Sequence, residues 1–328
     1  MARSRPTIRD VAGAAGVSVA TVSHALNDKG RLDIRTRERV RQIATELGYN
    51  PNPRARALRT GSGNTIGIVS SLIVDGTPGH DSTMDWYMRT AVAAANECLA
   101  QGYALTLVPP SDQQNWAQSL AVDGALLVDP DHDDPAIAAL VARGLPVIVI
   151  SGDATRDDVT TVTLDRASAV SCAMRHFAAR DRVNPALLVE SSGRQSAEGT
   201  RLAFVAWCAE RGITPRVAVA PAADAKSAAG YAATLDLLRN HPDTDAIYSP
   251  LDLLAHGAAA ALIAADRTDV ALVTAEGMIA RLSNPPMTAV DTKRELQAAT
   301  ATRMLIAQLR TGIRPPSQIF TADLIVRD

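Results

Sequence analysis

The sequence has few cysteines, no long apolar run and no apolar leader. Its 328 residues include three cysteines, Cys98, Cys172 and Cys208, which are widely spaced in apolar stretches. Such an odd, scattered set offers no zinc or redox pair, so we expect reduced cysteines that pack inside a cytoplasmic protein. No apolar stretch approaches the roughly 20 residues that span a bilayer, and no hydrophobic run follows the first residues. We therefore expect neither a membrane segment nor a secretory signal.

Motifs of enzymes and cofactor sites are also missing. The sequence contains no Gly-x-Ser-x-Gly elbow, no Walker loop and no His/Cys set at metal-ligand spacing. Glycines are dense at 61–67, but they precede an expected strand, whereas a dinucleotide fingerprint follows one. We therefore expect no catalysis, no metal and no cofactor.

The segment 7–27 has the pattern of a helix-turn-helix. Two short amphipathic stretches are joined at Gly16, and the second begins with Ser18, a good N-capping residue. The motif needs a small residue where its helices cross, a turn residue that tolerates positive φ and a branched apolar anchor. Ala12, Gly16 and Val22 supply these three. This arrangement lets the second helix enter a DNA major groove, so we expect the chain to bind double-stranded DNA.

The distribution of charge agrees with DNA binding. The formal net charge is −2, but residues 1–61 carry 12 Lys and Arg against 5 Asp and Glu, and the remainder is acidic. A basic head attracts phosphates through counterion release, and an acidic body does not compete for them. A basic run alone is usually a solvated helix face, but beside a helix-turn-helix it favours DNA contact.

The segment 50–62 links the basic head to the rest of the chain. Pro51 and Pro53 end the preceding helix, because the residue before a proline is pushed out of the helical region. Residues 54–59 are good helix formers but span under two turns, so a helix here needs outside support. A flexible Thr-Gly-Ser-Gly joint follows at 60–63.

Beyond residue 62, short apolar runs alternate with longer amphipathic stretches. This pattern predicts parallel sheets covered by helices on both faces. The expected strands lie at 66–71, 104–108, 124–128, 147–150, 186–189, 217–220, 246–248 and 271–273, and the expected helices at 86–101, 134–143, 167–179, 197–211, 227–240, 253–265 and 293–310. Two rounds of the pattern indicate an α/β body of two doubly wound subdomains, with a ligand cleft between them, behind an all-α head.

Several short segments carry a family resemblance. They read Thr-Ile-Arg-Asp-Val-Ala at 7–12, Ala-Gly-Val-Ser at 15–18, Thr-Val-Ser at 21–23, Thr-Arg-Glu-Arg-Val at 36–40 and Leu-Gly-Tyr-Asn-Pro-Asn at 47–52. Weaker matches are Val-Asp-Gly at 122–124, Pro-Val-Ile at 146–148 and Pro-Pro-Met-Thr at 285–288. On these segments the chain resembles the lactose/galactose repressor (LacI/GalR) family of transcription regulators, most specifically over its first 60 residues.

The resemblance implies a homodimeric repressor that binds a palindromic operator and is controlled by a small-molecule effector. It implies three parts: a helix-turn-helix domain at 1–49, a hinge helix and linker at 50–62, and an effector-binding and dimerisation domain at 63–328. The last part is periplasmic-binding-protein-like, with one subdomain at about 63–160 and 291–319 and the other at about 161–290 and 320–328. Because the chain ends at Asp328, shortly after its last apolar run, we expect a dimer without a tetramer-forming tail.

The resemblance also implies which head residues contact DNA. It places Val19, Ala20 and His24 against bases, where the first two suit thymine methyl groups. His24 stands where arginine is common, so bidentate reading of guanine is lost, and His24 either donates to a base or faces phosphate. Phosphate contacts, which set register rather than sequence, are expected from Thr7, Ser18, Thr21, Ser23, Asn27, Arg31 and Thr36.

Hinge residues are expected to contact DNA as well. The resemblance points to Asn52, Arg54, Ala55 and Leu58, with Leu58 wedged between base steps of the minor groove. Such a wedge partly unstacks one step and kinks the duplex, so that more protein surface reaches phosphate. The alternative is that Leu58 is a small core residue packed against the body.

The expected effector contacts depart from those of sugar-binding family members. Ser151 stands where an aspartate is usual, and Thr200, with Arg201 one place off, stands where an arginine is usual. The full set implied by the resemblance is Trp86, Tyr87, Ser151, Thr200, Arg201, Asp252 and Glu276. Where these polar groups are lost, each sugar hydroxyl left without a partner costs about 1–3 kcal/mol of binding free energy. We therefore expect that the effector is not a plain hexose; a carbohydrate derivative is one class that fits.

Two interpretations of the body remain open. Trp86 and Tyr87 either stack on a ligand or pack under the first sheet. The body as a whole is either an effector sensor or a dimerisation domain of a constitutive DNA-binding regulator that has lost its ligand.

We expect His24→Ala to relax operator preference more than it weakens nonspecific binding, because a base contact favours only the matched sequence. Affinity for operator should fall about five- to tenfold, while affinity for random duplex of the same length and salt stays nearly constant. Titration of both duplexes measures the difference. Equal losses on the two would contradict a base-reading role.

Overall fold

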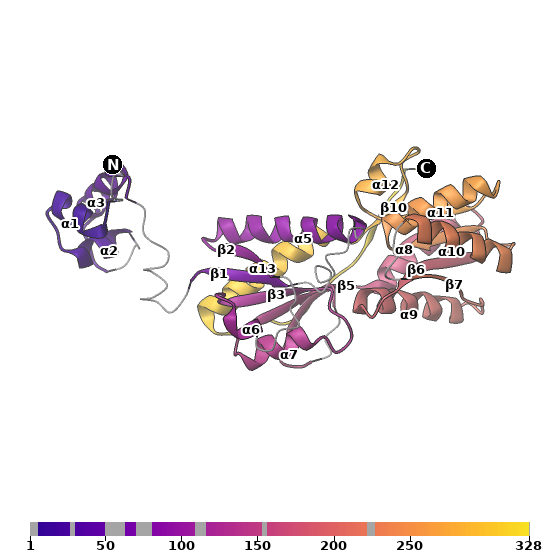
Figure 1. Ribbon diagram of the computed structural model, residues 1–328, viewed down its shortest axis with the longest axis horizontal. Coiled ribbons are helices and arrows are strands. Elements are labelled where there is room, and N and C mark those ends of the chain that lie inside the picture. Colours follow the sequence, from indigo (N-terminus) through magenta and orange to yellow (C-terminus); the bar gives the residue numbers. More distant parts are fainter. Residues whose placement is uncertain are drawn as a thin grey trace. The chain divides into compact units, whose positions relative to one another are not determined.

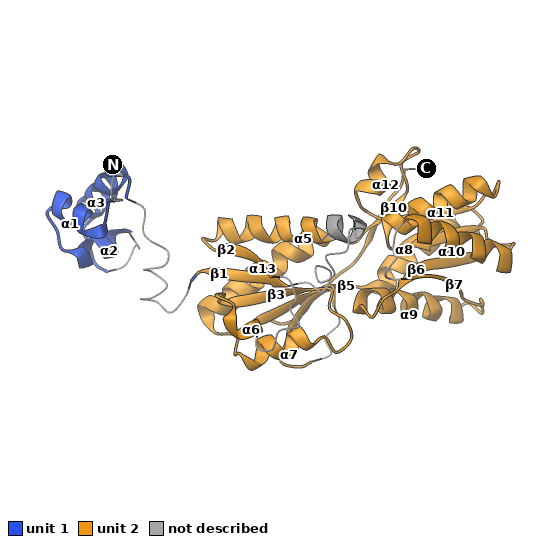
Figure 2. Cartoon of the chain, in the orientation of Figure 1, with its two compact units in different colours: residues 1–63 blue, residues 64–328 orange. Residues whose placement is uncertain are grey.

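The computed structural model of the protein describes residues 6–26, 30–49, 63–69, 81–108, 116–152, 156–221 and 227–327, with the backbone alone for 81–86 (Figure 1). The chain divides into two compact units, residues 1–63 and 64–328 (Figure 2). Each unit is described by itself.

The first unit contains three short helices around a small apolar core. Within the described residues 6–26 and 30–49 these helices are α1 (Ile8–Ala15), α2 (Val19–Leu26) and α3 (Ile34–Glu46). Val11, Val22 and Val40 are fully buried, one from each helix. α1 ends at Gly16, whose φ of 63° is a left-handed conformation that glycine adopts without a Cβ penalty. Ser18 Oγ then accepts a hydrogen bond from the backbone N of Thr21 at 3.1 Å. The predicted helix-turn-helix is confirmed.

The second unit contains two six-stranded sheets. The first sheet has the strand order β11-β5-β4-β3-β1-β2, and its neighbours all pair in parallel. Its strands are β1 (Thr65–Val69), β2 (Ala104–Val108), β3 (Gly124–Val128), β4 (Val147–Ile150), β5 (Thr160–Leu164) and β11 (Gln318–Phe320). Helices α5 (Asp81–Ala100) and α13 (Arg294–Thr311) cover one face, and α6 (Trp116–Ser119) and α7 (Pro135–Ala142) cover the other (Figure 1).

The second sheet has the order β12-β10-β9-β8-β6-β7. Its strands are β6 (Pro185–Ser191), β7 (Arg216–Pro221), β8 (Ala246–Ser249), β9 (Ala271–Ala275), β10 (Ala289–Asp291) and β12 (Asp323–Ile325). Helices α8 (Arg166–Ala178) and α9 (Gln195–Ala209) pack on one face, α10 (Ser227–Asn240) and α11 (Asp252–Ala264) pack on the other, and the short α12 (Met278–Leu282) follows β9. Cys98 lies in the core of the first sheet, and Cys172 and Cys208 in that of the second; all three are free and buried.

The chain crosses between the two sheets three times, at 164–166, 291–294 and 320–323. The first and third crossings are joined by a hydrogen bond from the backbone N of Asp165 to the carbonyl O of Phe320, at 2.8 Å. The second and third are joined by Lys293, whose Nζ lies 2.8 Å from Asp291 Oδ2 and 2.6 Å from Asp323 Oδ2. The three crossings therefore form one connected strap.

The predicted fold class, a helical head before two parallel α/β sheets, is confirmed, with two differences. β12 pairs with β10 in antiparallel register, and β5, β10, β11 and β12 were absent from the expected strands. β5 escapes an apolar-run search because three of its five residues are threonines. Thr160 Oγ1 donates to the carbonyl O of Pro315 at 2.8 Å, which satisfies the hydroxyl while the branched side chain is buried.

Among the described residues, no helix has the length and apolar character needed to cross a membrane.

Two glycines allow α10 and α11 to approach closely. A Cβ on Gly257 would lie 1.9 Å from the carbonyl O of Ser227, and a Cβ on Gly230 would lie 2.3 Å from that of Leu254. Because both obstacles are backbone atoms, an added methyl group would force the helices apart. The close packing of these helices therefore depends on the missing side chains.

We expect Gly257→Ala to destabilise the second unit by about 1–3 kcal/mol, because overpacking displaces two helices. Gly13→Ala is a matched control, since a Cβ on Gly13 of α1 would meet nothing within 4 Å. Its expected effect is a stabilisation of up to about 1 kcal/mol through helix propensity. Denaturant unfolding measures both, and similar small effects at the two positions would refute the close-packing argument.

Candidate functional site

One face of α2 is held by the core and the other is exposed. Val22 and Ala25 are fully buried, whereas Val19 is 42% exposed and Ala20 and His24 are exposed. The ring of His24 lies close to Gly30, because a Cβ on Gly30 would come within 2.9 Å of His24 Nδ1. The exposed face thus combines apolar and imidazole groups on a helix whose other side is fixed.

Thr7 and Thr36, two of the predicted phosphate contacts, form hydrogen bonds at helix N-termini. The backbone N and Oγ1 of Thr7 donate to Asp10 Oδ2 at 2.7 and 2.8 Å, and the backbone N of Thr36 donates to Asp33 Oδ1 at 3.1 Å. Thr36 Oγ1 also donates to Asp33 Oδ2. The backbone and hydroxyl bonds from Thr7 hold the pKa of the Asp10 carboxyl below its ordinary value, and the hydroxyl and backbone bonds from Thr36 do the same for the pKa of Asp33. Helix N-termini carry donor N–H groups and partial positive charge, which suits phosphate.

The remaining DNA-contact predictions are divided between described and undescribed residues. Arg31 is exposed, and Thr21 and Ser23 are half-buried on α2. Predicted contacts that lie outside the described residues are Asn27, Asn52, Arg54, Ala55 and Leu58, and the side chain of Trp86 lies outside them as well.

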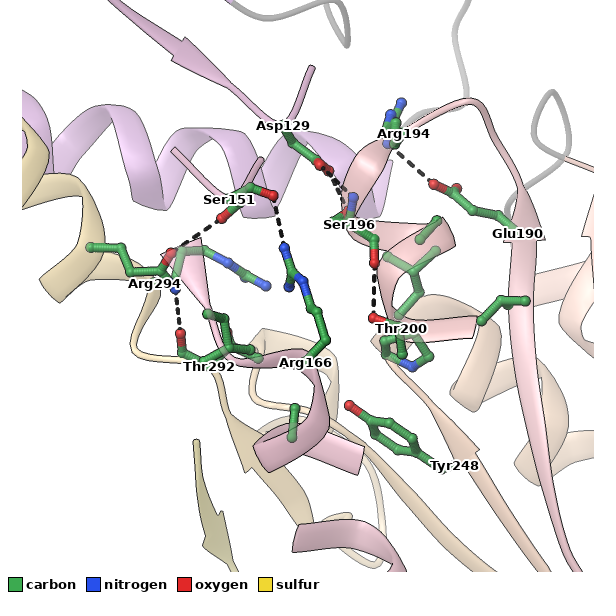
Figure 3. A pocket seen from close by; sticks show the side chains of 17 residues that line it. Asp129, Ser151, Arg166, Glu190, Arg194, Ser196, Thr200, Tyr248, Thr292 and Arg294 are labelled. Carbon is green, nitrogen blue, oxygen red and sulfur yellow. Dashed lines mark hydrogen bonds and ion pairs between the residues drawn. The ribbon is translucent and has the colours of Figure 1, made fainter. Parts of the chain in front are cut away.

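A cavity of about 80 Å³, room for several water molecules, lies where strands of the two sheets end (Figure 3). Its polar lining consists of Asp129, Ser151, Arg166, Glu190, Arg194, Ser196, Thr200, Tyr248, Thr292, Arg294 and Gln297. Its apolar lining consists of Leu164, Ala169, Val189, Ala197, Pro250 and Leu251. Ligands of open parallel sheets bind outside the carboxyl ends of strands, which is where this cavity lies.

Asp129 connects the end of β3 to the start of α9. It is 5% exposed and has a φ of 46°. Ser196 donates to its carboxylate through Oγ at 2.8 Å and through the backbone N at 3.3 Å. Burial raises the pKa of Asp129, and the positive charges of Arg194 and Arg166 oppose that rise.

Backbone hydrogen bonds continue this connection beside Asp129. The backbone N of His132 donates to the carbonyl O of Gly193 at 3.0 Å, and that of Gln195 donates to the carbonyl O of Pro130 at 3.1 Å. The loop after β3 and the loop before α9 are therefore paired along one edge of the cavity.

Two arginines in the lining have different partners. Arg194 Nη1 lies 3.4 Å from Glu190 Oε1, and both side chains are largely buried. Arg166, the first residue of α8, donates through Nη2 to the carbonyl O of Ser151 at 2.7 Å. Arg166 and Ser151 thereby link the second sheet to the end of β4 in the first.

Ser151 and Thr200, two of the predicted effector contacts, do line the cavity. Ser151 has a φ of 63°, and its Oγ donates to Gln297 Oε1 at 3.5 Å. Thr200 is 4% exposed, and its Oγ1 donates to the carbonyl O of Ser196 at 2.8 Å. Arg201, one residue further, is outside the lining and pairs with Glu198 at the surface.

Three other predicted contacts lie outside the lining. Tyr87 is 1% exposed in the core on the first sheet, where burial raises its pKa to about 12. Asp252 Oδ2 accepts a hydrogen bond from the backbone N of Ile279 at 3.3 Å, at the start of α12. Glu276 accepts from Arg327 Nη2 at 2.9 and 2.8 Å, which fixes the C-terminal segment against the end of β9.

Sequence reasoning missed most of the polar lining. The missed residues are Asp129, Arg166, Glu190, Arg194, Ser196, Tyr248, Thr292, Arg294 and Gln297. One signal was available, because Asp129 directly follows the expected strand 124–128. Residues from α8, α9 and α13 carried no such signal, since their positions depend on how the sheets face each other.

Comparison with known proteins assigns both parts of the chain. Residues 7–52 match the bacterial regulatory proteins of the lacI family, and residues 174–328 match the periplasmic binding protein-like domain. The chain belongs to the LacI family. It is a DNA-binding transcriptional regulator whose body has the periplasmic-binding-protein-like fold.

One relative of this LacI-family chain matches nearly its whole length, and another matches about three fifths of it. The HTH-type transcriptional repressor PurR of Erwinia tasmaniensis is 29% identical over 95% of this chain and 92% of its own length. The HTH-type transcriptional regulator MalR of Staphylococcus xylosus is 28% identical over 60% of this chain and 59% of its own.

Solved structures share the fold. A lac repressor dimer bound to operator and the anti-inducer ONPF matches with a TM-score of 0.78 and 21% identity, over 99% of this chain and 98% of that one. A complex of the transcriptional regulator CelR with cellobiose matches with a TM-score of 0.71 and 23% identity, over 98% of this chain and 99% of that one.

We expect Glu276→Gln to lower the free energy of unfolding by about 3 kcal/mol, because it leaves the largely buried Arg327 without its carboxylate. Glu198→Gln is the matched control, since it breaks the exposed pair with Arg201 and should cost at most about 1 kcal/mol. Denaturant unfolding measures both. Equal costs would contradict a structural role for the Glu276–Arg327 pair.

Proposed function

We propose that this LacI-family regulator is a repressor that binds a palindromic operator as a homodimer, and that a small-molecule effector in the cavity controls this binding. In this proposal residues 1–49 bind DNA, residues 50–62 form the hinge, and residues 63–328 bind effector and dimerise. The observation that carries the proposal is a cavity rich in buried polar groups in the same chain as a helix-turn-helix.

The exposed face of α2 reads the operator in this proposal. Val19, Ala20 and His24 lie on a helix that the core holds from the other side, so the helix keeps its shape when it enters the major groove. Thr7 and Thr36, with their helix N-termini, suit phosphate contacts that fix register.

Buried charge in the body favours a sensor over a domain that only dimerises. Asp129 is 5% exposed, Glu190 8% and Arg294 9%, and all three line the cavity. Burying such charged groups costs stability compared with an apolar core. A body that only dimerises has no reason to retain these charged groups. The ligand complexes of the similar lac repressor and CelR structures support an effector role.

An apolar stripe supports dimerisation. Met88 is 42% exposed, Val92 53% and Leu99 78%, and their spacing places them along one side of α5. Leu107, 49% exposed, lies on the edge strand β2 of the same sheet. Exposed apolar side chains gathered in this way indicate a surface that another protein copy covers.

The proposed regulator acts in the cytoplasm on nucleoid DNA. An effector changes operator affinity only by its differential affinity for the two arrangements of the body.

Selection of bound oligonucleotides from a random pool, with the full-length protein, tests the DNA-binding half of the proposal. We expect an inverted repeat. Ala20→Asp should weaken operator binding roughly 100-fold, because its carboxylate would meet phosphates and base acceptors. Ala206→Asp, on an exposed position of α9, should change it less than about twofold. Loss of binding in both variants, or a selected site without symmetry, would contradict the proposal.

Calorimetry against a metabolite panel, followed by operator titration, tests the effector half. A ligand that binds the body should shift operator affinity. If ligands bind the body and operator affinity stays constant, effector control is wrong.

A further inference from the structure

Arg166 has more hydrogen-bond donors than partners. A guanidinium carries five N–H donors, and among the described residues Arg166 uses one of them, on the carbonyl O of Ser151. Its Nε is buried and has no hydrogen-bond partner, and no carboxylate among the described residues lies within 4.0 Å of its nitrogens. A buried donor without an acceptor is costly, so this side chain gains from any acceptor that the cavity brings to it.

The carboxylates of the cavity, in contrast, already have donors. Asp129 accepts from the hydroxyl and the backbone N of Ser196, and Glu190 pairs with Arg194. A cationic or hydroxyl-rich ligand would have to compete with these internal donors. Arg166 Nε, a buried atom of the lining that has no hydrogen-bond partner, is a donor.

Charge points in the same direction. Arg166, Arg194 and Arg294 line the cavity against the two carboxylates of Asp129 and Glu190, which leaves an excess of positive charge. Tyr248 directs its hydroxyl toward the cavity between Arg166 and Thr200 (Figure 3), and this hydroxyl can donate a further hydrogen bond.

The rest of the lining is apolar. Leu164, Val189, Pro250 and Leu251 form walls that can bury a hydrocarbon portion but offer a ligand no side-chain hydrogen bonds. The cavity therefore combines one group of donors with an apolar pocket.

We infer that the effector of this protein is a small anion with an apolar portion, whose carboxylate or phosphate binds to the guanidinium of Arg166. This inference rests on the proposed effector function and specifies its ligand. Binding draws the free donors of Arg166 to the anion in a charge-assisted, fork-like contact. Because Arg166 already bonds Ser151 across the cavity, the bound anion lies where the two sheets meet and can bias their arrangement.

Paired probes test this inference on the full-length protein. The anionic probes are 4-methylpentanoate and isobutyl phosphate, and their neutral counterparts are 4-methylpentanamide and isobutanol. We expect at least one anion to raise the unfolding midpoint of the second unit and to bind in calorimetry, while its neutral counterpart does neither. Comparison of the two anions distinguishes carboxylate from phosphate.

Variants locate the contact. Arg166→Gln should weaken binding of the active anion about 10- to 100-fold, as expected for charge-assisted hydrogen bonds. Arg166→Lys keeps the charge without the planar fork and should show an intermediate loss. Arg175→Gln is the matched control, because Arg175 is exposed near the other end of α8; it should change affinity less than about twofold. Circular dichroism and the unliganded midpoint of each variant show whether it folds.

Several outcomes would overturn the inference: no binding of either anion, equal binding of a neutral counterpart, or an anion affinity that Arg166→Gln leaves unchanged. Release of operator by a neutral metabolite would overturn it while upholding effector control. If selection yields no operator but the anions bind through Arg166, the repressor proposal fails and the anion site stands.

Discussion

The hydrogen bonds between Asp129 and Ser196 join the first sheet to the second, in addition to the three short crossings of the chain. Asp129 extends from the end of β3 and Ser196 from the start of α9, so the contact spans the cavity edge. Backbone pairing of 130–132 with 193–195 adds to it. A ligand that enters the cavity either leaves these hydrogen bonds between the sheets intact or replaces them. The balance between these two arrangements is the quantity that such a ligand can change.

Much of the fold can be predicted from local patterns of apolar and polar residues in the sequence. The expected strands at 124–128 and 147–150 coincide with β3 and β4, because buried parallel strands read as unbroken apolar runs. The expected strand at 104–108 coincides with β2, which lies at the edge of the sheet and is largely exposed. The threonines of β5 hide it from such a search. Thr160 is compatible with a buried strand only because a distant carbonyl, that of Pro315, accepts its hydroxyl, and no local pattern reveals that partner.

The cavity was less accessible to sequence reasoning than the fold. The family resemblance placed Ser151 and Thr200 near a ligand, and both line the cavity. Arg166 was missed, because its importance arises from the facing end of β4. Glu276 looks like a ligand-binding acid in sequence, but its charge is met by Arg327, which lies 51 residues further along the chain. Long-range pairing of this kind decides whether a polar residue is available to a ligand or committed to the structure.

The triple strap between the sheets also constrains how genes for such regulators can be rearranged. Each sheet is assembled from stretches that alternate along the chain, and β11 and β12, from opposite sheets, are separated by two residues. An exchange of coding sequence near residue 63 transfers a complete head, because the first unit ends there. An exchange within the body splits both sheets at once. Recombination can therefore join this body to a different DNA-binding unit far more readily than it can exchange one of the two sheets.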